Sequence, residues 1–274
     1  MTIALDSHYT IGQFHLFCQD YVCHGLEPYP YVILADGCSA EPDSDVGARL
    51  LVLNARHLLP RFIAAAANEA GRRACHWRLG RRIVRRAARQ ARELGADSAL
   101  DATLLIAWCD GATVYVHLYG DGCLAARRAD GEVVAIQVEY AGNAPYYLSY
   151  LLDRERLALY RVATGNPLAA QSVGYVDETG TTTRLERFDA PLVFSFSLDA
   201  FPTVAVATDG LQSFVSASTN ERLSVLEVAR EMLEFDRSQD RFVQRRLHKL
   251  LLEYSKQLVF NLDDLGIGIF TRTE

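Results

Sequence analysis

The sequence predicts an α+β fold built on antiparallel β-sheets. Two pairs of β-rich segments are each joined by a short turn that contains Asp-Gly, the connection typical of β-hairpins. Several short apolar runs bounded by Asp and Gly indicate buried strands. Segments with the apolar spacing of helices lie between these blocks, a pattern that favours antiparallel sheets with inserted helices over a doubly wound parallel sheet.

The strongest strand predictions are the two hairpins. Residues 104–108 and 113–117 flank Asp110-Gly111, and residues 124–128 and 133–136 flank Asp130-Gly131. Glycine accepts positive φ without steric cost, so both turns can be tight. We expect the two hairpins to join into a four-stranded antiparallel meander. The other expected strands cover 14–22, 31–35, 191–196, 204–207 and 265–270.

Helices are expected between the strand blocks, where apolar residues recur at intervals of three and four. Pro60 should kink or end the first of them, because proline lacks the backbone N–H that a helix interior needs. No internal repeat and no linker rich in Pro, Gly or Ser interrupts the chain, so residues 1–274 are expected to form a single domain. The expected helices cover 46–62, 77–94, 146–160, 224–235 and 240–259.

Composition describes an ordinary folded protein. The 274 residues are 50% hydrophobic and 23% charged, and the net charge of −6 argues against a general nucleic-acid binder. The N-terminus lacks the basic and apolar regions of a secretory signal, and the longest apolar stretch contains Asp199 and Pro202, which excludes a membrane span. Six cysteines without CxxC spacing are typical of free thiols in a reducing compartment. We therefore expect a soluble, cytoplasmic protein.

Acidic residues mark the ends of the predicted strands. Asp36 and Asp209 each follow an apolar run and precede a glycine, and Asp121 does the same after residues 114–119. Asp20 lies in the first expected strand, and Asp263-Asp264 directly precedes the last one. A single Asp-Gly pair is explained by an ordinary turn. If these carboxylates met, their repulsion would require cations, and oxygen ligands without a His pair or Cys cluster suit Mg²⁺ or Mn²⁺.

Six segments, in order, resemble the metal-dependent protein Ser/Thr phosphatases of type 2C, most closely their compact bacterial branch. The resemblance implies a four-layer αββα sandwich of two antiparallel β-sheets flanked by helices, with a variable flap within about 142–189. It also implies an active site at one edge of the sandwich that holds two divalent ions, or three. The segments are CQDY (18–21), ADGCSAEPDSDVGA (35–48), DATLLIAW (101–108), YGDG (119–122), ATDGL (207–211) and LDDLGIGIF (262–270).

The resemblance assigns roles to individual residues. It implies that Asp36 bridges two Mn²⁺ or Mg²⁺ ions, and that Asp36 and Asp209 are the central catalytic carboxylates. A hydroxide between the ions would attack the phosphorus of phosphoserine or phosphothreonine in a protein substrate of a Ser/Thr kinase. Asp20 would act through coordinated water, and Asp121 and Asp209 would hold a third ion. The implied metal ligands are Asp20, Asp36, Gly37 (through its carbonyl), Asp121, Asp209 and Asp263.

Four positions depart from the pattern of the family. His15 stands where the phosphate-binding Arg is usual, and we expect it to contact phosphate or to be a structural side chain. Cys38 replaces the His that protonates the leaving group, while Gly122 and Gly266 replace a Ser and a Thr. Two alternatives to an active protein phosphatase therefore stay open. One is a catalytically weak phosphatase-like module that binds and regulates a partner, and the other is a binuclear phosphoesterase acting on a small phosphorylated metabolite.

Two further segments are unusual in composition, one rich in arginine and one rich in polar residues. Nine arginines lie within residues 72–92. We interpret them as a solvated helix face, with the docking of an acidic partner, a phosphopeptide or nucleic acid as the alternative. Within the expected flap, the polar run 177–183 is typical of a mobile loop. The sequence does not indicate the oligomeric state.

Overall fold

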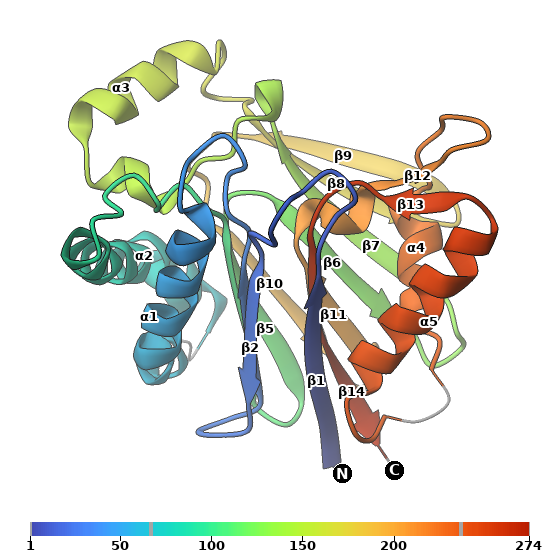
Figure 1. Cartoon of the computed structure of the whole chain (residues 1–274). Coiled ribbons are helices and arrows are strands. Elements are labelled where there is room, and N and C mark those ends of the chain that lie inside the picture. Colours follow the sequence, from blue (N-terminus) through green and yellow to red (C-terminus); the bar gives the residue numbers. More distant parts are fainter. Residues whose placement is uncertain (1, 66–67, 236–237, 274) are drawn as a thin grey trace.

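The chain folds into four layers, as Figure 1 shows. A computed structural model describes residues 2–65, 68–235 and 238–273. Two antiparallel sheets pack face to face in the middle, and helices cover their outer faces. The expected αββα sandwich is confirmed.

The larger sheet has seven strands and contains both ends of the chain. Thr2 pairs with Thr273, so the termini lie side by side in Figure 1. Every neighbouring pair is antiparallel. The spatial order is β1 (Thr2–Thr10), β14 (Leu265–Thr273), β11 (Thr203–Ala207), β6 (Gly122–Arg127), β7 (Val133–Tyr140), β8 (Gln171–Asp177) and β9 (Gly180–Glu186).

The smaller sheet has five strands, again all antiparallel. Its order is β10 (Leu192–Ser197), β5 (Thr113–Tyr119), β4 (Leu104–Cys109), β3 (Tyr31–Ala35) and β2 (Tyr21–Gly25). A short separate ribbon pairs β12 (Phe214–Ser216) with β13 (Val259–Asn261).

Side chains alternate along the strands and so feed three hydrophobic cores. In β3, Val32 and Leu34 belong to the core between the sheets, while Ile33 faces the core under the helices of the smaller sheet. In β14, Phe270 faces the core between the sheets and Ile269 faces the outer core of the larger sheet. This two-residue period is the reason that β3 and β14 carry apolar residues almost without interruption.

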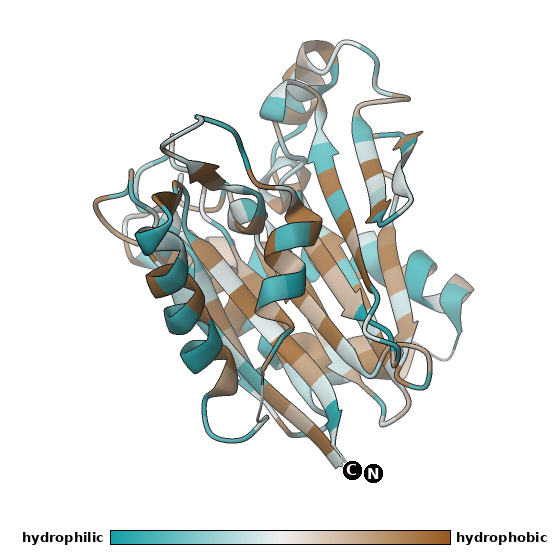
Figure 2. Cartoon of the chain, turned by 90° about the vertical axis from the view of Figure 1, so that its right-hand side faces the viewer, coloured by the Kyte–Doolittle hydropathy of each residue, from teal (hydrophilic) through white to brown (hydrophobic). Residues whose placement is uncertain are grey.

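Two long helices cover the smaller sheet: α1 (Ser44–Ala65) and α2 (Glu69–Glu93). On the other side, α4 (Val225–Met232) and α5 (Phe242–Lys256) cover the larger sheet, and Figure 2 shows teal and brown residues alternating along the helices that lie in front of its strands. The helix α1 continues through Pro60 to Ala65, so the expected end at this proline was wrong. No helix within residues 2–65, 68–235 and 238–273 is long and apolar enough to cross a membrane.

Both hairpins are confirmed, but the four-stranded meander was wrong. The strands β4 and β5 lie in the smaller sheet, whereas β6 and β7 lie in the larger one. The chain crosses between the sheets at Gly120-Asp121-Gly122, where the glycines adopt φ of 88° and 145°. Side chains other than glycine rarely adopt these angles, so the two glycines permit the crossing and leave Asp121 at the edge of the sandwich.

The first expected strand was also misplaced. The strand β2 begins only at Tyr21, residues 11–20 form a loop, and the preceding strand β1 was missed. The apolar run that indicated a strand is instead exposed: 77% of Phe14 and 97% of Leu16 are accessible to solvent.

The segment between β7 and β10 is more regular than expected. The predicted helix over 146–160 is divided into the 3₁₀ helix η2 (Leu148–Leu151) and α3 (Arg154–Ala163), and a further 3₁₀ helix, η1 (Ala141–Asn143), precedes this range. Asp153 starts α3 by accepting hydrogen bonds from the N–H groups of Glu155 and Arg156 at 2.8 and 3.1 Å. The polar run 177–183 forms the turn and flanking strands of the β8–β9 hairpin, so the expected loop there was wrong.

Candidate functional site

The strand-end carboxylates meet at one edge of the sandwich. Burial, followed by the charges of its neighbours, raises the pKa of Asp36 well above its ordinary value. The charges that act on Asp36 come from distant segments of the chain, which therefore lie together in one acidic region. The neighbours that act on Asp36 are Asp20, Asp209, Asp121 and Asp263.

A cavity of about 280 Å³ opens beside this cluster. Three of the predicted ligands, Asp121, Asp209 and Asp263, line it directly. Its walls also come from β7, the loop after it, η3 (Asp209–Gln212) and the loop before α4. The other lining residues are Val138, Glu139, Tyr140, Asn143, Gln212, Ser213 and Arg222.

Asp20 is buried directly before β2 and is only partly satisfied. Thr208 donates a hydrogen bond through its hydroxyl to Asp20 Oδ2 at 2.8 Å, and the N–H of Gly266 donates to the same hydroxyl at 2.9 Å. A Cβ at position 266 would lie 3.1 Å from Asp20 Oδ2, so the glycine leaves room for this carboxylate. Asp20 Oδ1 is buried and has no hydrogen-bond partner within the described residues. A carboxylate left in this way is suited to a cation.

The backbone of Asp36 is held on both sides by Thr103, the residue before β4. The N–H of Asp36 donates to Thr103 Oγ1 at 3.2 Å, and the carbonyl of Asp36 accepts from the N–H of Thr103 at 2.8 Å. The N–H of Gly37 donates to the carbonyl of Gln19 at 3.3 Å, which ties this turn to the segment that carries Asp20. Two predicted ligand segments are thereby fixed against each other.

Asp209 follows β11 and begins η3. Burial raises its pKa to about 6, with the Asp263 charge as the next cause, while a side-chain hydrogen bond with Asp36 partly offsets the increase. Two carboxyl groups form a hydrogen bond only if one of them carries a proton. Asp36 and Asp209, both predicted to bind cations, therefore lie within reach of each other.

The pair Asp263-Asp264 divides into an open and a closed carboxylate. Asp264 is 1% exposed and accepts hydrogen bonds from the N–H groups of Gly12 at 2.8 Å and Gln19 at 2.5 Å. Asp263 is 43% exposed and lines the cavity. Asp264 thus anchors the 11–20 loop, and Asp263 is the carboxylate of the pair that is available to a ligand.

His15 lies beside this acidic pair. Its Nδ1 is 3.0 Å from Asp264 Oδ2, and its Nε2 is 3.4 Å from Asp263 Oδ1. The predicted phosphate-contacting residue is therefore at the site, with its imidazole directed at carboxylates.

Sequence reasoning missed two residues at the site. Arg222 lines the cavity. Burial raises the pKa of Asp209 and of Asp263, and the charge of Arg222 offsets part of this increase. It lies in a loop without periodic pattern, so no signal in the sequence pointed to it. Burial raises the pKa of the Tyr147 phenol, and the next contributions come from Cys38 and then Asp121, which places this phenol near both. Its only signal was its position within the expected flap.

The donor set fits hard divalent cations. The five converging aspartates offer only oxygen, and Asp20 Oδ1 has no hydrogen-bond partner among the residues that the structure describes. Within the part of the chain that the structure describes, however, no three or more His, Cys, Asp or Glu side chains are already arranged to hold an ion.

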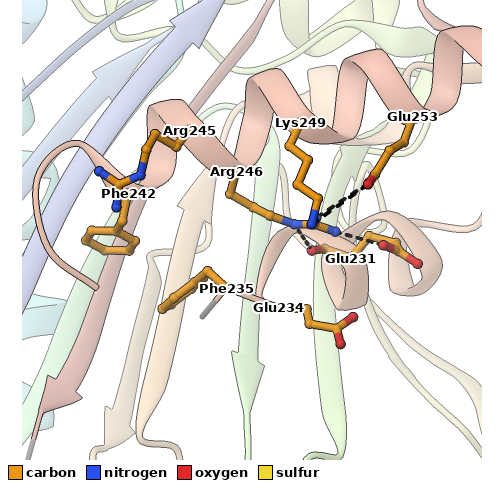
Figure 3. Close-up of a pocket in the computed structure, with 8 residues that line it drawn as sticks. All are labelled: Glu231, Glu234, Phe235, Phe242, Arg245, Arg246, Lys249 and Glu253. Carbon is orange, nitrogen blue, oxygen red and sulfur yellow. Dashed lines mark hydrogen bonds and ion pairs between the residues drawn. The ribbon is translucent and has the colours of Figure 1, made fainter. Parts of the chain in front are cut away.

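A larger hollow of about 730 Å³ lies elsewhere, between α4 and α5 (Figure 3). Four of its charged side chains pair with one another: Arg246 contacts the carboxylate of Glu231 at 2.8 Å, and Lys249 lies 3.9 Å from that of Glu253. The hollow shares no residue with the acidic cluster.

Comparison with known families identifies the chain. The family model described as Protein phosphatase 2C matches residues 6–252. The chain belongs to this family. No curated protein matches the sequence.

Solved phosphatase structures share the fold across the full length. A bacterial serine phosphatase is 13% identical, with 98% of each chain covered and a TM-score of 0.60. The Ser/Thr phosphatase of S. agalactiae is 15% identical, covering 99% of this chain and 100% of that one, with a TM-score of 0.59. The catalytic domain of the phosphatase PstP in complex with two manganese ions is 16% identical over 100% of both chains, with a TM-score of 0.53.

Proposed function

We propose that this protein is a metal-dependent phosphoprotein phosphatase that hydrolyses phosphoserine and phosphothreonine. The observation that carries the proposal is the convergence of five aspartates, each with its pKa raised, at one edge of a phosphatase-family sandwich. A cluster of this kind is stable at neutral pH when cations offset its charge. We place the enzyme in the cytoplasm, in keeping with its six free thiols, and its substrates among the products of Ser/Thr kinases.

The cluster would hold two Mn²⁺ or Mg²⁺ ions, or three. When bound, such ions supply an activated water and offset charge on the phosphoryl oxygens. The protein contributes the fixed turns at Asp36 and Asp209, which set where the substrate phosphate can lie. The proposed ligands are Asp20, Asp36, the Gly37 carbonyl, Asp121, Asp209 and Asp263.

Phosphate contact is assigned to two side chains at the site, Arg222 and His15. Arg222 lines the cavity and can offer a guanidinium to two phosphate oxygens at once. His15, close to Asp263, is the second candidate. An arginine from the loop before α4 would then replace the family arginine that is absent at position 15.

The test is the hydrolysis of a phosphothreonine peptide and of p-nitrophenyl phosphate with and without Mn²⁺. We expect activity only with the metal, and a loss of at least 100-fold in kcat for Asp36→Asn and Asp209→Asn. The matched control is Asp130→Asn, an exposed aspartate in the turn at the opposite end of β6 from Asp121, which should keep full activity. Unchanged activity in both cluster variants would contradict the proposal.

The same assay, with titration calorimetry of Mn²⁺ beside it, separates the two alternatives. No turnover of any phosphate ester, together with no tight binding of two Mn²⁺ ions, would indicate a regulatory module. Turnover of small phosphate esters with no activity on phosphopeptides would indicate a metabolite phosphoesterase.

A further inference from the structure

The helix α2 carries a stripe of arginines on its outer face. An α-helix turns by about 100° per residue, so the seven exposed arginines of α2 fall within an arc of about 140°. From Arg78 to Arg92 the stripe extends for about 21 Å at 1.5 Å per residue. We call this set the arginine stripe: Arg78, Arg81, Arg82, Arg85, Arg86, Arg89 and Arg92. The opposite face of α2 is buried in the core under the smaller sheet.

The stripe is largely unpaired. Arg92 lies 3.6 Å from Asp97, and in the ranges that the structure describes no carboxylate comes within 4 Å of the other six guanidinium groups. The two remaining arginines of the segment behave differently: Arg72 is buried with its guanidinium over the Tyr115 ring, and Arg73 pairs with Glu69. A solvated surface helix commonly pairs its charges at intervals of four residues, and this helix does not do so over most of the stripe.

The charge of the stripe contrasts with that of the remaining chain. The chain as a whole carries −6, so the chain without these seven positive charges carries −13. An anionic partner is therefore attracted to one helix face and repelled by most of the other surface. Concentrated charge of one sign in this setting favours a specific orientation of the partner.

We propose that the arginine stripe is a docking surface for an acidic polypeptide segment of a protein partner. Along one row of the stripe, Arg78, Arg82, Arg85, Arg89 and Arg92, the arginines are separated by four or three residues, which is about 4.5 to 6 Å of helix. In an extended peptide, side chains on one face repeat every two residues, about 6.7 Å. Carboxylates at alternate positions therefore meet successive guanidinium groups, each able to form a bidentate pair.

A short peptide fits this surface better than nucleic acid does. The stripe is one helix wide and is followed by the exposed Glu93 and Asp97, so a long polyanion would meet these carboxylates. Exposed aromatic side chains, which stack on unpaired bases, are absent from α2 as the structure describes it: Trp77 is partly buried and donates its indole N–H to the Asp189 carbonyl.

The experiment measures fluorescence anisotropy of a labelled twelve-residue peptide of alternating Glu and Ser. We expect binding at 50 mM salt that weakens at least tenfold by 300 mM, and no binding of the Gln-Ser analogue. The triple variant Arg82→Glu/Arg85→Glu/Arg89→Glu should weaken binding at least tenfold. The matched control Arg184→Glu/Arg230→Glu/Arg245→Glu makes the same change in net charge on β9, α4 and α5 and should weaken it less than twofold.

Three outcomes would overturn the proposal: no binding of the Glu-Ser peptide at 50 mM salt, equal loss in both triple variants, or tighter binding of a 20-base-pair DNA duplex than of the peptide. The milder variant Arg82→Gln/Arg85→Gln/Arg89→Gln, whose fold is checked by circular dichroism, should also bind the Glu-Ser peptide at least threefold more weakly. Because the assay measures binding without turnover, its result is independent of the proposed phosphatase activity.

Discussion

Single carboxyl groups at the acidic edge are held in an unfavourable ionic state. Burial is the first cause of the raised pKa of Asp20, Asp36 and Asp121, and neighbouring aspartates add to it. Without cations, each group that ionises at neutral pH does so against this cost. Function and stability therefore oppose each other at these residues.

Asp209→Asn should stabilise the metal-free protein. The folded pKa of about 6 lies above the ordinary value of 3.8, so the stabilising protonation is complete below pH 3.8 and lost as the pH rises through 6. Removal of the charge should raise the free energy of unfolding by about 1–3 kcal/mol at pH 7.5, with little gain at pH 4. Urea unfolding in EDTA at both values measures this difference. The exposed control Glu234→Gln should show no gain in stability at either pH. An Asp209→Asn variant less stable than the wild type at pH 7.5 would contradict the expectation.

Arg222→Ala should weaken substrate binding. Its guanidinium is the cavity-lining cation, so its loss should raise KM for p-nitrophenyl phosphate about three- to tenfold, with a smaller change in kcat. Steady-state kinetics with Mn²⁺ test this, with Arg222→Lys expected to recover part of the loss. The exposed control Arg154→Ala should behave as wild type in the same assay. A KM unchanged in Arg222→Ala would remove this residue from phosphate binding.

Among the structural elements, the 11–20 loop depends on one buried side chain. Asp264→Ala removes the acceptor of the Gly12 and Gln19 N–H groups, so we expect a loss of about 2–4 kcal/mol in unfolding free energy. Chemical denaturation measures the loss, and hydrogen exchange should become faster at the Gly12 and Gln19 amides. The turn variant Asp130→Ala is the control, with an expected loss below about 1 kcal/mol. Normal protection of both amides in Asp264→Ala would count against this anchoring role.

The helix α2 and the strand β5 are joined by a buried histidine pair. His76 Nδ1 lies 3.0 Å from His117 Nδ1, and the His117 ring packs against Phe62 and Trp108. Burial lowers the pKa of His117 to about 3 and that of His76 well below its ordinary value. Both rings are therefore neutral in the fold, and protonation competes with packing.

This pair should make the protein sensitive to mild acid. The folded pKa of His117 lies below its ordinary value of 6.5, so stability is lost as the pH falls from 6.5 towards 3. When the pH falls from 7.5 to 5.0, the unfolding free energy of His117→Phe should decrease by about 2 kcal/mol less than that of the wild type. Urea unfolding at the two pH values tests this. The exposed His57→Phe should retain the wild-type pH dependence, and equal losses in all three proteins would refute the idea.

At the scale of the whole molecule, the acidic edge links folding to cation binding. A ligand that binds only the folded state, present at 100 times its Kd, adds about 2.7 kcal/mol to the unfolding free energy. For a chain of this size, saturating Mn²⁺ should therefore raise the midpoint of thermal unfolding by about 5–10 °C, and EDTA should reverse the shift. Asp36→Asn should lose most of this shift. An equal shift in Asp36→Asn, or none in wild type, would separate the cluster from metal binding.

Much of the fold was predictable because its signals are local. Asp110-Gly111 and Asp130-Gly131 specify tight turns, and alternating apolar residues specify which face of a strand is buried. The sheet to which a hairpin belongs depends on contacts far along the chain. For this reason the predicted four-stranded meander was wrong, because the chain changes sheets at Asp121. Phe14, which was predicted to lie in a strand, is exposed.

The sequence by itself determined the strand-end aspartates, the two hairpins and the family, because each is written in neighbouring residues or in ordered motifs. Only the tertiary structure decided which side chains face one another. Asp263 lines the cavity, whereas Asp264 accepts a hydrogen bond from the N–H of Gly12. Arg222 lines the same cavity from a loop that has no periodic sequence pattern. The physical reason is that repulsion, burial and pairing between charges depend on distances in space, and spacing along the chain does not set those distances.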